Sequence, residues 1–291
     1  MIMQKKVNWV LDADIESFYD HLDHSVMMRC LSERISDPKF KRLIGKFLKA
    51  GVMEGKDYIR TPEGTIQGGN ISPILANIYL HYVLDLWFEK REKKQRKGYL
   101  QLVRYADDFL IGAQYQSQAE EIREAIATRL QTFGLTLSQE KTTIKEFGRF
   151  ASENCARRGE RSPTLDFLGF THYNSKTRDG RYKVRIKTSR KRINKALVAT
   201  NAWLKTVRSK ESTEIIWQTL SAKLQGHYNY YGVSGNFEGI NRYYQKTLSL
   251  TFKWLNRRSR KKSWNMEGFR RYLETYPLPQ PKLTYAIYNT W

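Results

Sequence analysis

An apolar residue at every second position of residues 7–13 constrains the fold more than any other feature of the chain. The odd positions are all apolar: Val7, Trp9, Leu11 and Ala13. A period of two is typical of a half-buried β-strand, because successive side chains point to opposite faces of a sheet. We therefore expect a strand whose apolar face packs on a core. Asp12 and Asp14 would then lie on the opposite face, at the end of the strand.

A second acidic segment is expected at a turn. Two apolar stretches, residues 99–105 and 109–113, flank Ala106-Asp107-Asp108 and predict a hairpin. Asp pairs are common in turns, where they bond nearby backbone, so a purely structural role for this pair is an equal alternative.

Helices and further strands are indicated elsewhere. Ser72-Pro73 is a helix start, and the helical period continues to about Lys94. Ser117 and Glu120 predict a capping box for a helix that ends near Phe133. Residues 153–163 suggest a loop. The remaining ranges predict short strands at 165–173 and 181–187 and helices at 188–209, 213–229 and 238–258. The expected architecture is α+β up to residue 187, followed by a basic α-helical domain over 188–291.

The charge is strongly asymmetric. The chain carries 51 Lys and Arg against 29 Asp and Glu, a formal net charge of +22. Residues 151–291 hold 28 of the basic residues and only 9 of the acidic ones. Such an excess favours a polyanionic partner, because basic side chains that meet phosphates release condensed counterions. A solvated basic surface is the alternative, and a membrane surface is a weaker one.

Other classes of protein are disfavoured. No apolar run approaches the length of a membrane span, and the first residues have no apolar signal core. Cys30 and Cys155 are far apart in sequence and lack CxxC partners, so we expect packing residues and not a disulfide or a zinc site. His21 and His24 have a helical spacing that could seat a metal, but no further soft ligand follows.

The three carboxylates Asp14, Asp107 and Asp108 need an explanation if they meet in one cleft. Carboxylates brought together repel unless cations neutralise them, which suggests bound Mg²⁺. Two such ions roughly 3.5 to 4 Å apart can activate an attacking hydroxyl and stabilise a leaving oxygen in nucleotidyl transfer. The pattern therefore favours a polymerase or nuclease site.

Several segments, in order along the chain, resemble the group II intron-encoded reverse transcriptases and maturases. They are Asp14-Ile-Glu-Ser-Phe-Tyr-Asp20, Gln67-Gly-Gly-Asn-Ile-Ser-Pro73, Tyr105-Ala-Asp-Asp108, Leu137 to Lys141, Phe167-Leu-Gly-Phe170, Gly226-His-Tyr-Asn-Tyr-Tyr-Gly232 and Lys253 to Ser259. The resemblance covers about residues 7 to 285. It implies a right-hand polymerase palm, an antiparallel sheet with packed helices, over 1–187, and a helical thumb or maturase domain over 188–291.

The resemblance also implies roles for individual residues. Asp14, Asp107 and Asp108 would be the catalytic, metal-binding carboxylates for two Mg²⁺ ions. Tyr19 would lie under the incoming sugar and exclude a 2′-hydroxyl, although a core tyrosine is the alternative. Gln67 would contact the incoming nucleotide or template, and Lys141 the pyrophosphate.

Basic residues in two clusters are expected to contact nucleic acid, with a solvated face as the alternative. They are Arg185, Lys187, Arg190, Lys191 and Arg192 in the first cluster and Arg257, Arg258, Lys261 and Lys262 in the second. Tyr228, Tyr230 and Tyr231 could stack on bases, but aromatic residues between helices more often pack a core.

The resemblance implies an RNA-directed DNA polymerase of a mobile group II intron that also binds intron RNA and aids its splicing. Its partners would be intron-like RNA, an RNA template, a DNA primer or target and deoxynucleotides, with no membrane. Members of this family carry a fingers region before the first palm motif, whereas only 13 residues precede Asp14 here. A non-catalytic RNA-binding maturase or an inactive truncated remnant is therefore the alternative, and a separate fingers fragment or a homo-oligomer could complete the site. We expect the chain in the bacterial cytoplasm or nucleoid, or else in an organelle.

Overall fold

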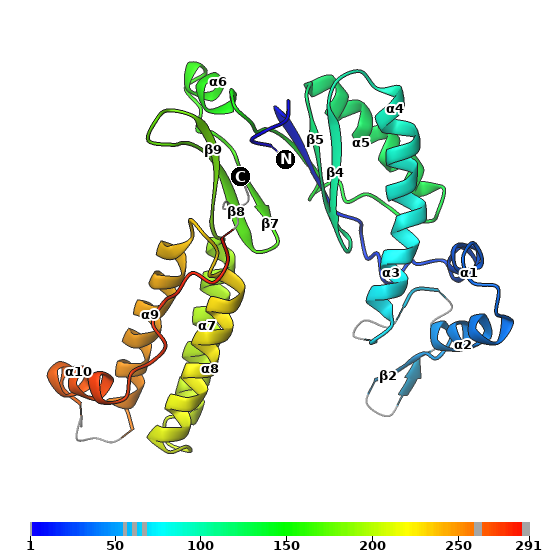
Figure 1. Ribbon diagram of the computed structural model, residues 1–291. Coiled ribbons are helices and arrows are strands. Elements are labelled where there is room, and N and C mark those ends of the chain that lie inside the picture. The colour runs from blue at the N-terminus through cyan, green and yellow to red at the C-terminus, as the bar shows by residue number, and fades with distance from the viewer. Residues whose placement is uncertain (1, 55–56, 60–62, 66–68, 259–263, 287–291) are drawn as a thin grey trace. The chain divides into compact units, whose positions relative to one another are not determined.

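A computed structural model describes residues 2–54, 57–59, 63–65, 69–258 and 264–286 (Figure 1). The chain forms two compact units. The first contains residues 1–163 and 174–184, and the second contains residues 164–173 and 185–291. The mixture of helices and antiparallel strands confirms the predicted α+β class. Within the described ranges, no helix is long and apolar enough to cross a membrane.

The first unit is built on a four-stranded antiparallel sheet with the order β4-β5-β1-β6. Its strands are β1 (Trp9–Ala13), β4 (Leu100–Tyr105), β5 (Asp108–Ala113) and β6 (Thr143–Glu146). In register, Ala13 pairs with Phe109 on one side of β1, and Asp12 pairs with Thr143 on the other. The predicted strand and hairpin are therefore both confirmed.

One face of this sheet packs on the main core of the unit. Leu11, Ala13, Phe109 and Ile111 are nearly inaccessible to solvent and belong to one cluster with residues of the surrounding helices. Alternation along β1 thus predicted the buried face correctly. Val10 departs from the pattern, because it points to the opposite face and is also buried.

The first unit contains several α-helices. They are α1 (His24–Ser32), α2 (Pro38–Leu48), α3 (Ser72–Leu80), α5 (Gln116–Gln131) and α6 (Ala151–Arg157). The side chains of Asp23 and Asp37 accept backbone N–H groups at the starts of α1 and α2. A small hairpin, β2 (Val52–Glu54) with β3 (Asp57–Ile59), follows α2.

The long helix predicted from Ser72 is a continuous helical run, but its middle is not regular α-helix. After α3, two π-helical segments, η1 (His81–Asp85) and η2 (Phe88–Glu92), lead to α4 (Lys93–Gln95). Segments of this kind are often found near functional sites.

Two local expectations are wrong. Helix α5 begins after Tyr115 without a side-chain cap, because Gln118 is buried and bonds Gln114 N and Lys97 O, so Ser117 is not the cap. The stretch expected as a loop contains most of α6. This helix is held by Glu146, which accepts hydrogen bonds from Asn154 and Arg158. Cys30 and Cys155 are buried, as expected for packing residues.

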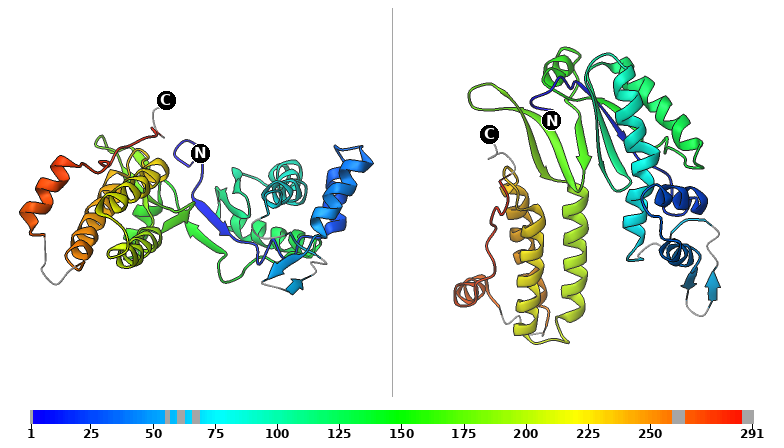
Figure 2. Two further views of the ribbon diagram at one scale, coloured as in Figure 1. Left: turned by 90° about the horizontal axis from the view of Figure 1, so that it is seen from below. Right: turned by 45° about the vertical axis from the view of Figure 1, so that its right-hand side comes forward.

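A three-stranded sheet precedes a helical bundle, and residues 164–173 and 185–188 of this sheet belong to the second unit. Strands β7 (Thr164–Phe167), β8 (Phe170–Lys176) and β9 (Tyr182–Thr188) form a sheet in that order. Helices α7 (Arg190–Val207), α8 (Thr213–Tyr231) and α9 (Phe237–Leu255) lie side by side, with α10 (Met266–Thr275) after them (Figure 2). All three helices predicted in this half are present.

Asn236 connects three parts of the second unit. Its side chain accepts a hydrogen bond from Thr188 N and donates to Thr188 Oγ1 and Tyr231 O, each at 2.8 Å. Asn236 is 1% exposed, so these bonds satisfy an amide that is sealed from water. The end of β9 is thereby fixed to the end of α8 and the start of α9.

Candidate active site

The ends of β1 and β5 bring two of the predicted carboxylates to neighbouring positions. The last registered pair of these strands is Ala13 with Phe109. Continuing the antiparallel register by one residue places Asp14 opposite Asp108. Both residues then lie on the face of the sheet away from the main core, because paired residues point to the same face.

Lys141 is held beside Asp14 by backbone bonds. Ser138 N donates to Asp14 O at 2.8 Å, and Glu16 N donates to Thr136 O at 2.9 Å. The segment that precedes Lys141 is thus fixed to the chain that follows β1. The Lys141 ammonium donates to Asp14 Oδ2 at 2.7 Å. This hydrogen bond and the negative charge of Asp14, with smaller contributions from Glu16 and Asp108, raise the pKa of Lys141.

Asp107 lies in the two-residue turn between β4 and β5. Ala106, the other turn residue, has φ 55°. This left-handed backbone conformation is unfavourable in free energy for any residue that has a Cβ. Arg104 stabilises this turn through hydrogen bonds of its side chain. Its guanidinium donates to Ala106 O at 2.8 Å, to Asn77 Oδ1 at 2.9 Å and to both carboxylate oxygens of Asp85. The π-helical segment that carries Asp85 therefore helps to place Asp107.

Tyr19 lies close to this turn. Burial and, to a smaller extent, the charge of Asp107 raise the pKa of its phenol. The ring also packs edge-on against Phe18 at a centroid distance of 5.3 Å. Tyr19 is therefore both a packing residue and a neighbour of a predicted catalytic carboxylate.

The segment Gly64-Thr65 fixes the backbone of Tyr19 and was not found from the sequence. Thr65 N donates to Tyr19 O at 2.6 Å, and His24 Nε2 bonds Gly64 O at 2.7 Å. Gly64 has φ 82°, and a Cβ there would lie 2.6 Å from Asp20 O. Only glycine fits this position without a shift of the backbone. The positive φ of Gly64 and its close approach to Asp20 depend on the tertiary contact with residues 19–20, so the sequence alone could not reveal them.

The carboxylates suit a divalent metal by their chemistry, since Mg²⁺ prefers hard oxygen ligands. Among the residues that the structure describes, no three His, Cys, Asp or Glu side chains are gathered as a metal-holding group. Asp14 is neutralised by the Lys141 ammonium at 2.7 Å. The carboxylates therefore suit a divalent cation by their chemistry, and binding at Asp14 would require Lys141 to move away from it. Of the other predicted site residues, Gln67, Lys261 and Lys262 lie outside the described residues.

The predicted basic clusters lie at opposite ends of the helical bundle. Arg185, Lys187, Arg190, Lys191 and Arg192 are exposed where β9 leads into α7. Arg257 and Arg258 follow the far end of α9. The Arg258 guanidinium already makes hydrogen bonds within the protein, because it donates to Thr213 Oγ1 and Glu211 O at the start of α8. The fold does not unite the two clusters into one patch.

The aromatic segment at the end of α8 packs on the hairpin formed by β7 and β8. Tyr230 donates to Leu168 O at 3.0 Å, and its ring stacks on Phe170. Tyr231 contacts Phe170 edge-on, and Tyr228 is 1% exposed. Tyr228 and Tyr231 are thus core residues, whereas Tyr230 remains half exposed.

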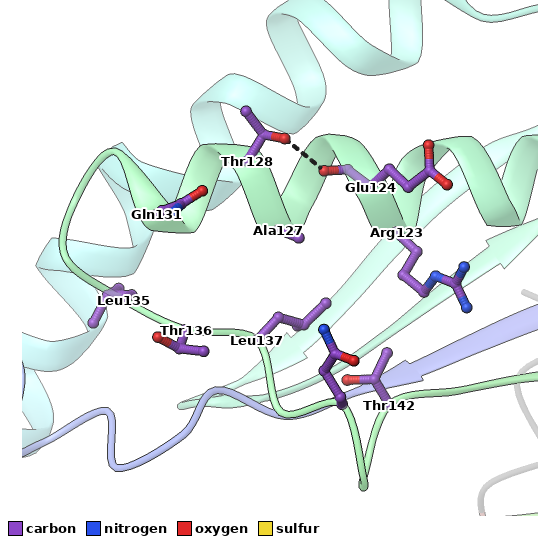
Figure 3. A pocket seen from close by; sticks show the side chains of 10 residues that line it. Arg123, Glu124, Ala127, Thr128, Gln131, Leu135, Thr136, Leu137 and Thr142 are labelled. Carbon is purple, nitrogen blue, oxygen red and sulfur yellow. Dashed lines mark hydrogen bonds between the residues drawn. The ribbon is translucent and has the colours of Figure 1, made fainter.

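A separate cavity of about 520 Å³ lies between α5 and residues 135–142 (Figure 3). Arg123 and Thr128 come from the helix, and Leu137 and Thr142 come from the segment that leads to and follows Lys141. None of the predicted site residues lines this cavity.

The profile of the family described as Reverse transcriptase (RNA-dependent DNA polymerase) matches residues 2–172, more than half of the chain. The match contains the two strand ends, the acidic turn and the Lys141 segment. The chain belongs to this reverse transcriptase family.

The chain is similar in sequence to proteins encoded by group II introns. The chain is 28% identical to the group II intron-encoded protein LtrA of Lactococcus lactis subsp. cremoris, over 80% of this chain and 50% of LtrA. It is 35% identical to protein YkfC of Escherichia coli K12, over 47% of this chain and 43% of YkfC. The chain spans about half the length of LtrA. The predicted resemblance to group II intron-encoded proteins is confirmed.

Among solved structures, the apo telomerase of Candida tropicalis is similar, with a TM-score of 0.49 and 15% identity. That alignment covers 92% of this chain and 44% of the telomerase chain.

Proposed function

We propose that this chain carries out RNA-directed DNA synthesis in a group II intron system. The observation that carries the proposal is the meeting of Asp14, Asp108 and Lys141 at the ends of the central strands, with Asp107 in the adjoining turn. Its support is the family match over residues 2–172. In this proposal, residues 1–187 form the palm and residues 188–291 the thumb or maturase domain.

The proposed metal ligands are Asp14, Asp107 and Asp108, for two Mg²⁺ ions. Divalent metal ions bound there would favour ionisation of a primer 3′-hydroxyl and neutralise the leaving pyrophosphate. The protein would hold the carboxylates on rigid strand ends and use Arg104 to fix the turn. The Lys141 ammonium would leave Asp14 and bind the pyrophosphate instead.

Tyr19 and Gln67 are the proposed nucleotide contacts. Tyr19 would select deoxynucleotides by excluding a 2′-hydroxyl, and its position beside Asp107 supports this role. The Tyr19→Ala variant tests it, because ribonucleotide incorporation should rise if the ring is the barrier. Unchanged selectivity would leave Tyr19 as a packing residue.

The proposed partners are intron RNA, an RNA template, a DNA primer or target and deoxynucleotides. The basic residues of the two clusters in the second unit would contact nucleic-acid phosphates. Work on such substrates would take place in the cytoplasm or nucleoid of a bacterium, or in an organelle. A separate fragment or a second copy of the chain could complete the template channel.

A second candidate function is RNA binding without catalysis, as a splicing maturase. The excess of 28 basic over 9 acidic residues in 151–291 favours it. It predicts tight, salt-dependent binding of intron RNA that is indifferent to the carboxylates of the first unit.

Primer extension separates the two candidates. Synthesis on an RNA template with a DNA primer, Mg²⁺ and deoxynucleotides should be abolished in Asp107→Asn and unchanged in the control Asp179→Asn, which alters an exposed turn. RNA binding is measured in the same samples. Synthesis that persists in Asp107→Asn refutes the catalytic proposal, whereas no synthesis with full RNA binding in every sample supports the maturase.

A further inference from the structure

Helix α2 in the first unit carries an unusual surface that contains none of the predicted site residues. Residues 38–49 contain five basic residues and no acidic one, although residues 1–150 as a whole are close to neutral. Ile44 and Leu48 are buried and anchor the helix to the main core. The remaining faces of the helix are exposed and fall into distinct stripes.

An apolar stripe and a basic stripe run in parallel along α2. Phe40, Leu43 and Phe47 are 44%, 47% and 49% exposed and follow an i, i+3, i+7 spacing that places them on one face. Lys39, Arg42 and Lys46 follow the same spacing one residue earlier and are also exposed. Two aromatic rings are therefore bordered by a row of cations.

The basic stripe continues into a cavity between α1 and α2. This cavity has a volume of about 520 Å³ and is lined by His24, Met28, Lys41, Arg42, Gly45, Lys46, Leu48 and Lys49. None of these described lining residues is acidic. Lys41 is oriented by a hydrogen bond from its ammonium to Ser32 Oγ at 3.2 Å. The cations at the rim of this cavity favour an anionic ligand.

We propose that α2 is a binding surface for single-stranded RNA. Phosphates would lie along the basic stripe at Lys39, Arg42 and Lys46, and bases would stack on Phe40 and Phe47. Exposed aromatic rings beside cations are the combination that binds unpaired nucleotides, because stacking accepts any base and the cations meet the backbone. This contact is additional to the clusters of the second unit and does not depend on catalysis.

A lipid surface fits α2 less well. The exposed apolar stripe consists of only three residues, and the neighbouring apolar face is already buried in the core through Ile44 and Leu48. An acidic protein partner would use the cations but would not require two aromatic rings separated by two helical turns.

The cation contribution is tested in the full chain with a fluorescent, unstructured RNA of about 20 nucleotides. In Arg42→Gln/Lys46→Gln, loss of two phosphate contacts should weaken binding about ten-fold at 0.15 M salt and lower the slope of log K against log salt by about 1.4. The control Lys90→Gln/Lys94→Gln removes the same charge from exposed positions on the helical run after α3. Equal effects in both variants would overturn the proposal, since they would reflect net charge alone.

The stacking contribution is tested with the apolar stripe. Phe40→Ala and Phe47→Ala should each weaken RNA binding about five-fold, and Phe47→Trp should retain it. Leu43→Ala removes a similarly exposed apolar side chain that cannot stack, so it should change affinity less than two-fold. Equal losses in all three alanine variants would show general apolar contact and overturn the stacking model. Circular dichroism confirms that each variant is folded.

Two competing outcomes are measured with the same variants. Binding to phosphatidylglycerol vesicles or to polyglutamate that depends on α2, while RNA affinity does not, would overturn the proposal. The Asp107→Asn variant should bind this RNA as tightly as the wild type. Failure of DNA synthesis and failure of the α2 contact are therefore distinguishable.

Discussion

Lys141 Nζ lies 2.7 Å from Asp14 Oδ2, although the two residues are 127 positions apart in the sequence. Asp14 is 21% exposed and the Lys141 side chain 70% exposed, so the anion is fixed by its strand and the cation reaches it from solvent. Lys141 can therefore leave Asp14 without any rearrangement of the sheet. The pair behaves as a carboxylate with a removable counter-ion.

The Lys141→Met variant tests this exchange. Without the competing ammonium, Asp14 should bind Mn²⁺ more tightly, which a titration followed by electron paramagnetic resonance measures directly. The maximal rate of DNA synthesis should fall about 100-fold if Lys141 also assists the leaving group. Lys145→Met is the control, because Lys145 lies 3.7 Å from Asp12, two residues before Asp14. Identical Mn²⁺ affinities in the wild type and Lys141→Met would contradict the exchange.

Arg104→Lys should impair the turn that carries Asp107 while it preserves charge. Lysine cannot make the two parallel bonds to Asp85 and reach Ala106 O at the same time. We expect a loss of about 1–2 kcal/mol in the free energy of unfolding and a fall of about ten-fold in the rate of primer extension. Arg96→Lys disrupts an ion pair in which two guanidinium nitrogens donate to Glu92 Oε2, and it should lower stability alone. A normal extension rate in Arg104→Lys would exclude a positioning role.

Gly64→Ala should be much more harmful than Gly134→Ala. Both glycines have positive φ, 82° and 71°, so alanine is strained by about 1 kcal/mol at each. A Cβ on Gly64 also meets Asp20 O and Tyr19 O, whereas a Cβ on Gly134 meets nothing within 4 Å. Urea unfolding should therefore show at least about 2 kcal/mol more destabilisation for Gly64→Ala. Equal losses would mean that the close contact with Tyr19 is easily relieved.

The second unit should lose stability in mild acid because of His227. Burial lowers the pKa of this imidazole from 6.5 to about 4, and its ring stacks on Tyr243 at a centroid distance of 3.9 Å. Between these two pH values the unfolded chain binds a proton that the folded chain does not. The free energy of unfolding therefore keeps its full value above pH 6.5 and decreases as the pH falls from 6.5 towards 4. At pH 5 the loss should be about 1–2 kcal/mol.

His227→Phe keeps an aromatic ring against Tyr243 but removes the titratable group. Unfolding at pH 7.5 and pH 5 should show a smaller acid loss in this variant than in the wild type. Burial also lowers the pKa of His172, so some pH dependence should persist. The explanation is wrong if the two proteins lose the same free energy.

The fold was predictable where one local pattern decides it. Alternation at residues 7–13 predicted β1 and its buried face, and the apolar stretches around Asp107 predicted the hairpin. The start of α5 was not predictable, because the buried side chain of Gln118, and not Ser117, organises it through a distant carbonyl. Helix α6 was missed for a similar reason, since its partner Glu146 belongs to another element.

The acidic residues of the candidate site were predictable from the sequence, but the contacts that position them were not. The acidic residues were found from their positions at strand ends and in a turn. The support from Arg104 and Gly64 depends on contacts with Asp85 and Tyr19 that no spacing in the sequence reveals. Residues that act through others are harder to find than residues that carry the charge.

The separation of the basic clusters at the two ends of the bundle sets a minimum ligand length. Helix α7 has 18 residues, which at 1.5 Å per residue is about 27 Å. A polyanion that neutralises Arg190 and Arg257 at once must bridge about this distance, or roughly eight base pairs at 3.4 Å per step. A shorter duplex reaches only one end and gains only part of the electrostatic free energy. In the proposed function, the bundle would thus discriminate nucleic acids by their length, independently of their sequence.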